Sequence, residues 1–312
     1  AIKLPPRKTM GVSMASMEEE VFTIMKEAMM DLKNRDNVEI IWLDANKKEE
    51  KQKQDIDYLL KQNVDVIVIN PVNSNKSSKL VEKIQKAGIP VVSIDRFVEN
   101  TNLSGYITAD NFRVGTEQAK YLSEQIDHQG EIVVLKGDKE NNVAYEITNG
   151  NKEVLKKELK IQIVAEKWHK GWSPELAEIT VRKALEEYPD IKGILANNSD
   201  MAMAAVKVLK EKKMIERIIT VGADASKEAC IAIAKGEHDA DVDKMPYILG
   251  LTTFKAAIMI ARKKTWYYDQ RIKSGEYSIP VKITPVLLID KYNIVALKDR
   301  WKEFDKYIEK IK

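Results

Sequence analysis

The chain has 312 residues, of which 44% are hydrophobic and 32% charged, and its 51 basic and 48 acidic side chains leave a net charge of +3. This length and composition are typical of a globular protein with one large or two ordinary domains, and the near balance of charge argues against a nucleic-acid binder. The sequence has no apolar run of about twenty residues that could span a membrane. A single cysteine, Cys230, excludes an internal disulfide and a cysteine-rich metal site, and its apolar helical surroundings predict a buried thiol.

Strands and helices alternate through the first 110 residues. Short β-branched runs predict strands over 9–14, 38–43, 65–70, 91–94 and 103–108. Apolar residues at helical spacing predict helices over 17–34, 47–62 and 76–86. Strict alternation of this kind predicts a parallel sheet with helices on both faces.

The alternation restarts after Asn111, which we expect to cap the next helix, and Ser173 followed by Pro174 marks the start of another. Further strands are predicted over 131–135, 162–166, 193–197, 218–222, 239–243 and 286–289. Further helices are predicted over 113–125, 149–159, 174–187, 200–212, 227–235, 247–262 and 299–308.

The two halves of the chain resemble each other. DVIVINP at 65–71 is similar to IKGILANN at 191–198, and VVSIDR at 91–96 is similar to ITVGAD at 219–224. In both halves one strand ends in Asn, and the strand after the next helix ends in Asp. Any two parallel strands look somewhat alike, but the matching Asn and Asp at these strand ends favour duplication of an α/β half. We therefore predict two similar three-layer α/β/α domains facing each other across a cleft, where small ligands usually bind.

Polar side chains follow several predicted strands at their carboxyl ends, where open α/β sheets bind ligands. Asp95 and Arg96 follow one strand, and Asn198 and Asp224 follow two others. A carboxylate beside a guanidinium offers two acceptors and a forked donor to one small polar molecule. The alternative interpretation of Asp95 and Arg96 is a structural salt bridge.

Other candidates lie in loops or on aromatic side chains. They are Asn141, Asn142, Lys244, Trp168 and Phe22. A sugar requires this mixture, because its hydroxyls both donate and accept hydrogen bonds while its C–H faces pack on aromatic rings. Trp168 could instead be a core residue with Trp172 as its partner, and Lys244 could be an ordinary surface lysine.

Sequence motifs for catalysis and cofactors are missing. The chain has no GxGxxG after a strand, no P-loop and no GxSxG elbow. Its three histidines, His128, His169 and His238, lie far apart and without metal-ligand spacing. We expect a binding protein without enzymatic activity, metal or cofactor.

With these residues assembled, the chain resembles the periplasmic (type I) sugar-binding protein family, and within it most closely the D-xylose binders. The resemblance covers nearly everything from Thr9 to Ile294. It includes GIPVVSIDR, YITADNFRVGTEQA, EKWHKGWSPE, ILANNSDMAMAAV and VGADAS. The EKWHKGWSPE stretch is more typical of xylose binders than of ribose binders.

The resemblance implies roles for individual residues. Asp95 and Arg96 match the pair that holds the sugar from the first domain, Asn198 and Asp224 match ligands from the second, and Lys244 matches a ligand lysine beside the hinge. Trp168 matches the tryptophan that lines the cleft, and Phe22 matches an aromatic residue of the first helix.

This sequence departs from the family pattern at three places. A family arginine is replaced by Val21, an acidic ligand aligns with Asn141, and the usual Asn-Asp pair is Asn198-Ser199, with Asp200 displaced by one. These departures leave glucose or another aldose as alternatives to xylose.

The implied domains are 1–110 with 246–284 and 111–245 with 285–312, joined by hinges near 110, 245 and 285. The resemblance implies that the domains close on a monosaccharide and present it to a membrane ABC permease; a membrane sensor histidine kinase is the alternative partner, and no nucleic acid is expected. The effector domain of a LacI-type repressor is a remote alternative. Such repressors carry a helix-turn-helix before the first strand, whereas only eight residues precede Thr9 here. The expected location is extracytoplasmic, in the periplasm or anchored at the cell surface, with no signal sequence in this chain and a start at Ala1 that suggests processing.

Overall fold

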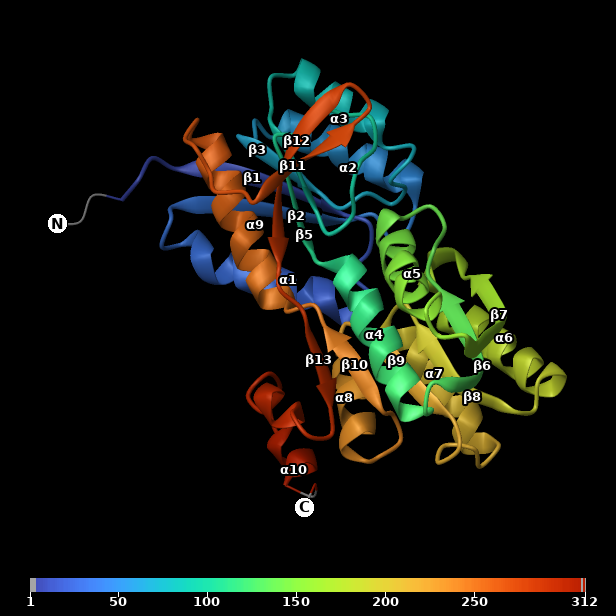
Figure 1. The fold of residues 1–312 in the computed structure, drawn as a ribbon. Helices are drawn as coiled ribbons and strands as arrows, with labels where there is room; N and C mark the ends of the chain where they lie inside the picture. The colour runs from blue at the N-terminus through green and yellow to red at the C-terminus, as the bar shows by residue number, and fades with distance from the viewer. Residues whose placement is uncertain (1–3, 310, 312) are drawn as a thin grey trace. The chain divides into compact units, whose positions relative to one another are not determined.

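The computed structural model describes residues 4–309 and 311. Residues 1–3, 310 and 312, which belong to the ends of the predicted domains, lie outside the described residues. The chain divides into two compact units, and each has a β-sheet with helices on both faces (Figure 1). Unit 1 comprises Ala1–Ala109, Glu140–Val143 and Met245–Pro285. Unit 2 comprises Asp110–Lys139, Ala144–Lys244 and Val286–Lys312. This architecture confirms the predicted α/β fold class.

The sheet of unit 1 has seven strands within the described residues, in the order β11-β12-β5-β4-β3-β1-β2. The strands are β1 (Lys8–Met14), β2 (Val38–Asp44), β3 (Val66–Ile69), β4 (Val91–Ile94), β5 (Gly105–Ala109), β11 (Gln270–Ser274) and β12 (Tyr277–Thr284). The helices are α1 (Glu20–Lys33), α2 (Glu49–Lys61), α3 (Ser78–Lys86) and α9 (Pro246–Ala261). Apolar clusters on the two faces pack beneath α1 with α9 and beneath α2 with α3.

Strands β3 and β4 are buried along their whole length, as their β-branched runs predict. Full burial of each such side chain contributes roughly 1.5–3 kcal/mol. Helices α1 and α9 approach closely on one face of this sheet, since a Cβ at Gly250 would lie 2.5 Å from the carbonyl oxygen of Met25. The chain therefore needs a glycine at position 250.

The predicted parallel arrangement holds through most of the sheet of unit 1 and fails at its β11 edge. Strand β12 pairs in parallel with β5 but antiparallel with β11, and the hairpin turns at Gly275, whose φ is 59°. The sequence predicts no element between 262 and 286, because this segment is mostly polar and β11 is largely exposed. Edge strands with charged residues lack the apolar run that identifies buried strands.

The sheet of unit 2 has six strands within the described residues, in the order β13-β10-β9-β8-β6-β7, and β13 is antiparallel to β10. The strands are β6 (Gln129–Lys136), β7 (Lys160–Trp168), β8 (Ile191–Ala196), β9 (Ile219–Ala223), β10 (Ala240–Asp243) and β13 (Leu287–Asp290). The helices are α4 (Asn111–Gln125), α5 (Asn142–Leu155), α6 (Pro174–Glu187), α7 (Ser199–Glu211), α8 (Lys227–Ala234) and α10 (Asp305–Ile308), with short 3-10 turns η1 (Lys170–Trp172) and η2 (Ile294–Leu297).

Helix starts in unit 2 follow the predicted capping at one position and differ at another. The Ser173 side chain accepts a hydrogen bond from Leu176 N, with Pro174 in the first turn, as expected. Helix α4 is capped by Asp110, which accepts from Arg113 N at 3.0 Å, so the prediction that Asn111 is the cap is wrong. Asn111 lies inside the first turn.

Two predicted helices have different lengths in the structure. Helix α5 begins at Asn142 rather than at 149, because Val143, Ala144 and Ile147 form a buried apolar face. The last helix is reduced to α10, since Phe304 turns into the core beside α8. Cys230 belongs to the same apolar cluster, and its predicted burial is confirmed.

Segment Glu140–Val143 groups with unit 1, whereas we expected all of 111–245 to lie in the second domain. Its Asn142 Oδ1 accepts a hydrogen bond from Phe97 N at 2.7 Å, and Asn142 Nδ2 donates to the Tyr106 hydroxyl at 3.1 Å. These long-range bonds account for the grouping, and nothing in the local sequence indicates them.

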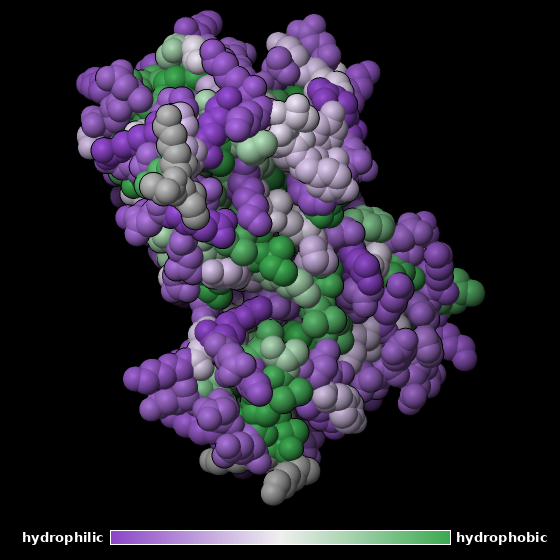
Figure 2. Space-filling view, turned by 90° about the vertical axis from the view of Figure 1, so that its left-hand side faces the viewer, coloured by the Kyte–Doolittle hydropathy of each residue, from purple (hydrophilic) through white to green (hydrophobic). Residues whose placement is uncertain are grey.

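Charged and polar residues cover most of the face seen in Figure 2, with smaller apolar areas between them. Among the helices of the described residues, we find none with the length and apolar character needed to cross a bilayer.

Candidate functional site

Asp95 and Arg96 directly follow β4 and are only 3% and 6% exposed. Asp95 has a left-handed backbone with φ of 63°, and its N–H donates to Ile107 O at 2.8 Å. Its own carbonyl accepts from the hydroxyls of Tyr106 at 2.7 Å and Thr108 at 3.2 Å. Left-handed non-glycine residues persist where the surroundings over-determine them, and they cluster at ligand clamps. Strand β5 thus holds Asp95 in a fixed orientation.

The structure brings Phe22 of α1 to this strand end. The Arg96 guanidinium carbon lies 5.6 Å from the centre of the Phe22 ring, and the ring is 3% exposed. Cation–π contacts of this kind contribute about 0.5–2 kcal/mol. Asp95, Arg96 and Phe22 together combine a carboxylate, a forked donor and an aromatic ring at one place in unit 1.

Asn141 and Asn142 have different roles in unit 1. Asn142 is committed to the structure through Phe97, Tyr106 and the Ser74 hydroxyl at 3.2 Å. Because Tyr106 in turn donates to the Asp95 carbonyl, Asn142 supports Asp95 indirectly. Asn141 is 2% exposed, and its Oδ1 has no hydrogen-bond partner among the described residues. A buried acceptor of this kind is suited to a polar ligand.

Three neighbouring strands of unit 2 end in the predicted polar residues. Asn198 follows β8, Asp224 follows β9 and Lys244 follows β10, and these strands are adjacent in the sheet. Asn198 also caps α7, accepting from Met201 N at 2.9 Å. Asp224 has a φ of 98°, and its N–H donates to Val242 O at 2.8 Å. Asn198 and Lys244 are each 4% exposed, so the structure places the three at one edge of unit 2.

The two tryptophans of EKWHKGWSPE occupy different environments. Trp168 ends β7, where its ring packs 4.6 Å from the Tyr145 ring centre and lies 4.3 Å from Lys136 Nζ. Trp172 is 7% exposed, has a φ of 58°, and lies directly on Gly137 after β6. A Cβ at Gly137 would come within 2.4 Å of the Trp172 ring, so only glycine allows this packing.

Two buried side chains near these tryptophans were not among the predicted site residues. Asp138 is 7% exposed and accepts from Gly171 N at 2.6 Å, which fixes the loop that carries Trp172. His169 bonds Lys136 O at 2.7 Å through Nδ1 and Thr180 Oγ1 at 2.9 Å through Nε2, and burial lowers its pKa. An acidic residue two places after the β6 strand was the available signal for Asp138.

Burial also lowers the pKa of Lys136, with Glu166 at 3.6 Å partly opposing that shift.

Among the residues that the structure describes, none of the clusters of histidine, cysteine, aspartate or glutamate reaches the three ligands needed for a metal ion. Each unit therefore offers hydrogen-bonding groups and aromatic rings at its strand ends. Two α/β units with acids, amides and bases at the carboxyl ends of adjacent strands define a protein that binds a small polar solute.

The sequence profile of the periplasmic binding protein domain matches residues 10–265, and the chain belongs to this family. It is 29% identical over 261 residues to the D-xylose-binding periplasmic protein of Escherichia coli, covering 82% of this chain and 79% of that protein. It shares 26% identity and a TM-score of 0.83 with a solved ABC transporter solute-binding protein from Mycobacterium smegmatis with bound glycerol, covering 94% and 97% of the two chains.

A third comparison shows the fold alone. The fructose-binding periplasmic domain of a hybrid two-component system has a TM-score of 0.83 at 21% identity, over 98% of each chain.

The family match and the first two relatives confirm the resemblance to sugar-binding periplasmic proteins and support an extracytoplasmic location. They identify the chain as a solute-binding protein rather than an enzyme.

Proposed function

We propose that this protein binds a monosaccharide, with D-xylose as the first candidate and D-glucose as the next. The observation that carries the proposal is the buried Asp95-Arg96 pair beside Phe22. A carboxylate accepts from two adjacent hydroxyls, a guanidinium donates to others, and the ring covers an apolar C–H face. Similarity to a D-xylose-binding relative supports xylose at 29% identity.

In this proposal both units contribute to one sugar site. Unit 1 supplies Asp95, Arg96, Phe22 and Asn141, with Asn142 as a supporting residue. Unit 2 supplies Asn198, Asp224, Lys244 and an aromatic ring. That ring is Trp168, which also contacts Tyr145 and Lys136, or Trp172, which packs on Gly137. Binding would draw the units together by rotation about the crossovers near 110, 245 and 285.

We propose delivery of the bound sugar to a membrane ABC permease outside the cytoplasm, which the solved solute-binding relative supports. A second candidate is sensing through a membrane histidine kinase, which the fold shared with a domain of a two-component system supports. Crosslinking in membranes followed by purification of this protein separates the two. Recovery of a kinase without a permease would defeat the transport role.

Isothermal titration with xylose, glucose, ribose, galactose and arabinose tests the sugar site directly. We expect tight binding of xylose or glucose and its loss in Asp95→Ala. Asp57→Ala is the matched control, since Asp57 lies on α2 in an exposed ion pair with Lys83. No heat with any of the five aldoses would overturn the proposal.

A further inference from the structure

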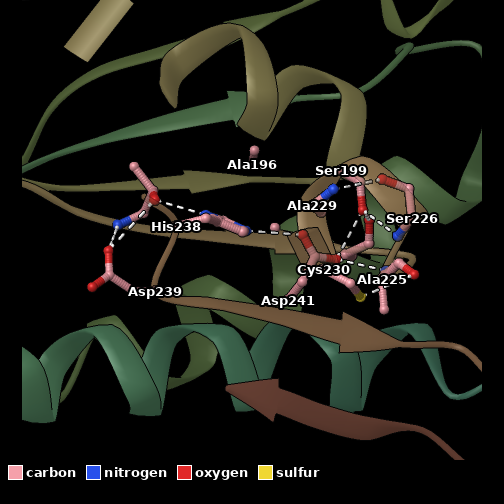
Figure 3. A network of polar contacts seen from close by, with 12 residues as sticks. Ala196, Ser199, Ala225, Ser226, Ala229, Cys230, His238, Asp239 and Asp241 are labelled. Atoms are coloured by element: carbon pink, nitrogen blue, oxygen red, sulfur yellow. Dashed lines mark hydrogen bonds and ion pairs between the residues drawn. The ribbon is translucent and has the colours of Figure 1, made fainter. Parts of the chain in front are cut away.

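A buried carboxylate in unit 2 lies at the centre of a hydrogen-bond network (Figure 3). Asp241 of β10 is 0% exposed. Its Oδ1 accepts from Ala225 N at 2.7 Å and from Ser199 Oγ at 2.9 Å, and its Oδ2 accepts from His238 Nε2 at 3.0 Å. Three donors from three segments of the chain therefore meet at one carboxylate.

Two of these donors directly follow proposed sugar ligands. Ser199 is the residue after Asn198, and Ala225 is the residue after Asp224. The Ser199 hydroxyl also lies 2.8 Å from Ala223 O and accepts from Ser226 N at 3.2 Å. Asp241 thus ties the chain after β8 to the chain after β9, one residue beyond each proposed ligand.

The backbone at the β9 exit needs such support. Asp224 and Ala225 are consecutive non-glycine residues with φ of 98° and 47°. Left-handed conformations in successive residues with a Cβ are unfavourable and persist only when neighbouring groups hold them. The hydrogen bond from Ala225 N to Asp241 Oδ1 stabilises this backbone conformation, and Asp241 belongs to strand β10 of the sheet.

The strand beside Asp241 is shaped to admit its carboxylate. Asp241 pairs with Gly222 of β9, and a Cβ at Gly222 would lie 2.3 Å from Asp241 Oδ2. His238 is anchored on its far side, with Nδ1 2.7 Å from Thr220 Oγ1. Because Asp241 stands between Ser199 and His238, the hydroxyl is not beside an imidazole base, and the trio is not a nucleophilic triad.

We propose that Asp241 is the positioning residue for the sugar-binding edge of unit 2, holding Asn198 and Asp224 in register through Ser199 and Ala225. The inference rests on the proposed monosaccharide function. Asp241 itself does not touch the ligand in this proposal. Its loss lowers sugar affinity by releasing the two strand exits from a common support.

Asp239→Asn provides a matched control two residues away. The Asp239 carboxylate accepts from Thr220 N at 2.8 Å and from Thr220 Oγ1 at 3.5 Å. It therefore reaches Asp241 only through Thr220 and His238, at the end of the network away from Asn198 and Asp224. We compare the two carboxylates by titrating xylose and glucose into wild type, Asp241→Asn and Asp239→Asn. Circular dichroism first shows that each protein is folded. We expect about a tenfold or larger loss of affinity in Asp241→Asn and a change below about twofold in Asp239→Asn.

Ser199→Ala keeps the test decisive where Asp241→Asn fails to fold, since it removes one arm of the network and keeps the carboxylate. We expect a loss of sugar affinity of about threefold or more in Ser199→Ala. Amide hydrogen exchange adds a readout that general destabilisation does not reproduce: exchange at 224–226 should accelerate in Asp241→Asn by more than exchange in the rest of unit 2, and it should stay slow in Asp239→Asn.

The outcomes separate this inference from the function on which it rests. If wild type binds xylose or glucose and neither Asp241→Asn nor Ser199→Ala lowers the affinity, the positioning role is wrong and the sugar site stands. Equal losses of affinity in Asp241→Asn and Asp239→Asn would likewise overturn it. If wild type binds none of the five aldoses, both proposals fail.

Discussion

The ends of β4 in unit 1 and β9 in unit 2 have the same backbone arrangement with different supports. Asp95 and Asp224 each follow a buried strand in a left-handed conformation, and each donates its N–H to a carbonyl of the adjacent parallel strand. In unit 1 the Asp95 carbonyl is held by the Tyr106 and Thr108 hydroxyls. In unit 2 the hold comes from the Asp241 carboxylate through Ala225 N.

This difference shows that similar backbone conformations at two strand ends do not require similar supporting side chains. A hydroxyl–carbonyl bond is neutral, and its removal costs only about 0.5–1.5 kcal/mol. A buried carboxylate with three donors is different, because Asn in its place keeps one acceptor oxygen and presents an amide nitrogen to the donor at Oδ2, His238 Nε2. Unit 2 should therefore tolerate substitution at its supporting group much less than unit 1.

The largest expected effect comes from weakening the supporting group of each strand end in turn. Asp241→Asn should lower the free energy of unfolding of unit 2 by about 3 kcal/mol, because it weakens hydrogen bonds to a charged acceptor. Tyr106→Phe, which removes the bonds to the Asp95 carbonyl and from Asn142, should lower that of unit 1 by about 1–2 kcal/mol. Urea unfolding followed by circular dichroism measures both. Equal losses in the two variants would contradict the distinction between a charged and a neutral support.

A smaller effect is expected at Gly137 of unit 2, on which the Trp172 ring packs. The groups that hold Asp95 in unit 1 include no such contact between a glycine and a ring. Gly137→Ala forces the Trp172 ring away from β6 and should destabilise unit 2 by about 1–3 kcal/mol, as overpacking does. Thermal unfolding and sugar titration should both respond. Lys139→Ala, an exposed residue of the same loop, is the control and should behave as wild type. An unchanged melting temperature in Gly137→Ala would show that the ring moves without cost.

The smallest expected effect is a difference in pH dependence, since all three histidines belong to unit 2. Burial lowers the pKa of folded His169, so the unfolded chain binds more protons there and stability rises with pH. Its contribution is fully present above the unfolded value of about 6.5 and is lost as pH falls below it, with a slope of at most about 1.4 kcal/mol per pH unit.

Melting temperatures of wild type and His169→Gln between pH 5 and 8, in steps of about half a unit, measure that contribution as a difference. The subtraction is necessary because burial raises the pKa of Asp239 in the same unit, which makes stability fall as pH rises through the acid range. Parallel curves for the two variants would contradict the assignment to His169.

Much of the fold follows from short-range patterns. The β-branched runs at β3 and β4 and the Ser173-Pro174 start of α6 are local features, and the structure has them where the sequence predicts them. Placement of Asp95 and Asp224 at strand ends is equally local. The Gln270–Ser274 and Tyr277–Thr284 hairpin was missed because an exposed edge has no apolar periodicity.

The sequence by itself determined the alternating elements, the two α/β halves and the polar strand exits, because each depends on neighbouring residues and on the solvent exposure that their spacing implies. Only the tertiary structure decided which groups support those exits. Asn142, Gly137 and Asp241 act on residues far from them in the chain, through hydrogen bonds or close contacts. Such contacts leave no periodic signal in one sequence, so Asp241 looks like the neighbouring acids Asp239 and Asp243 until the strands are assembled.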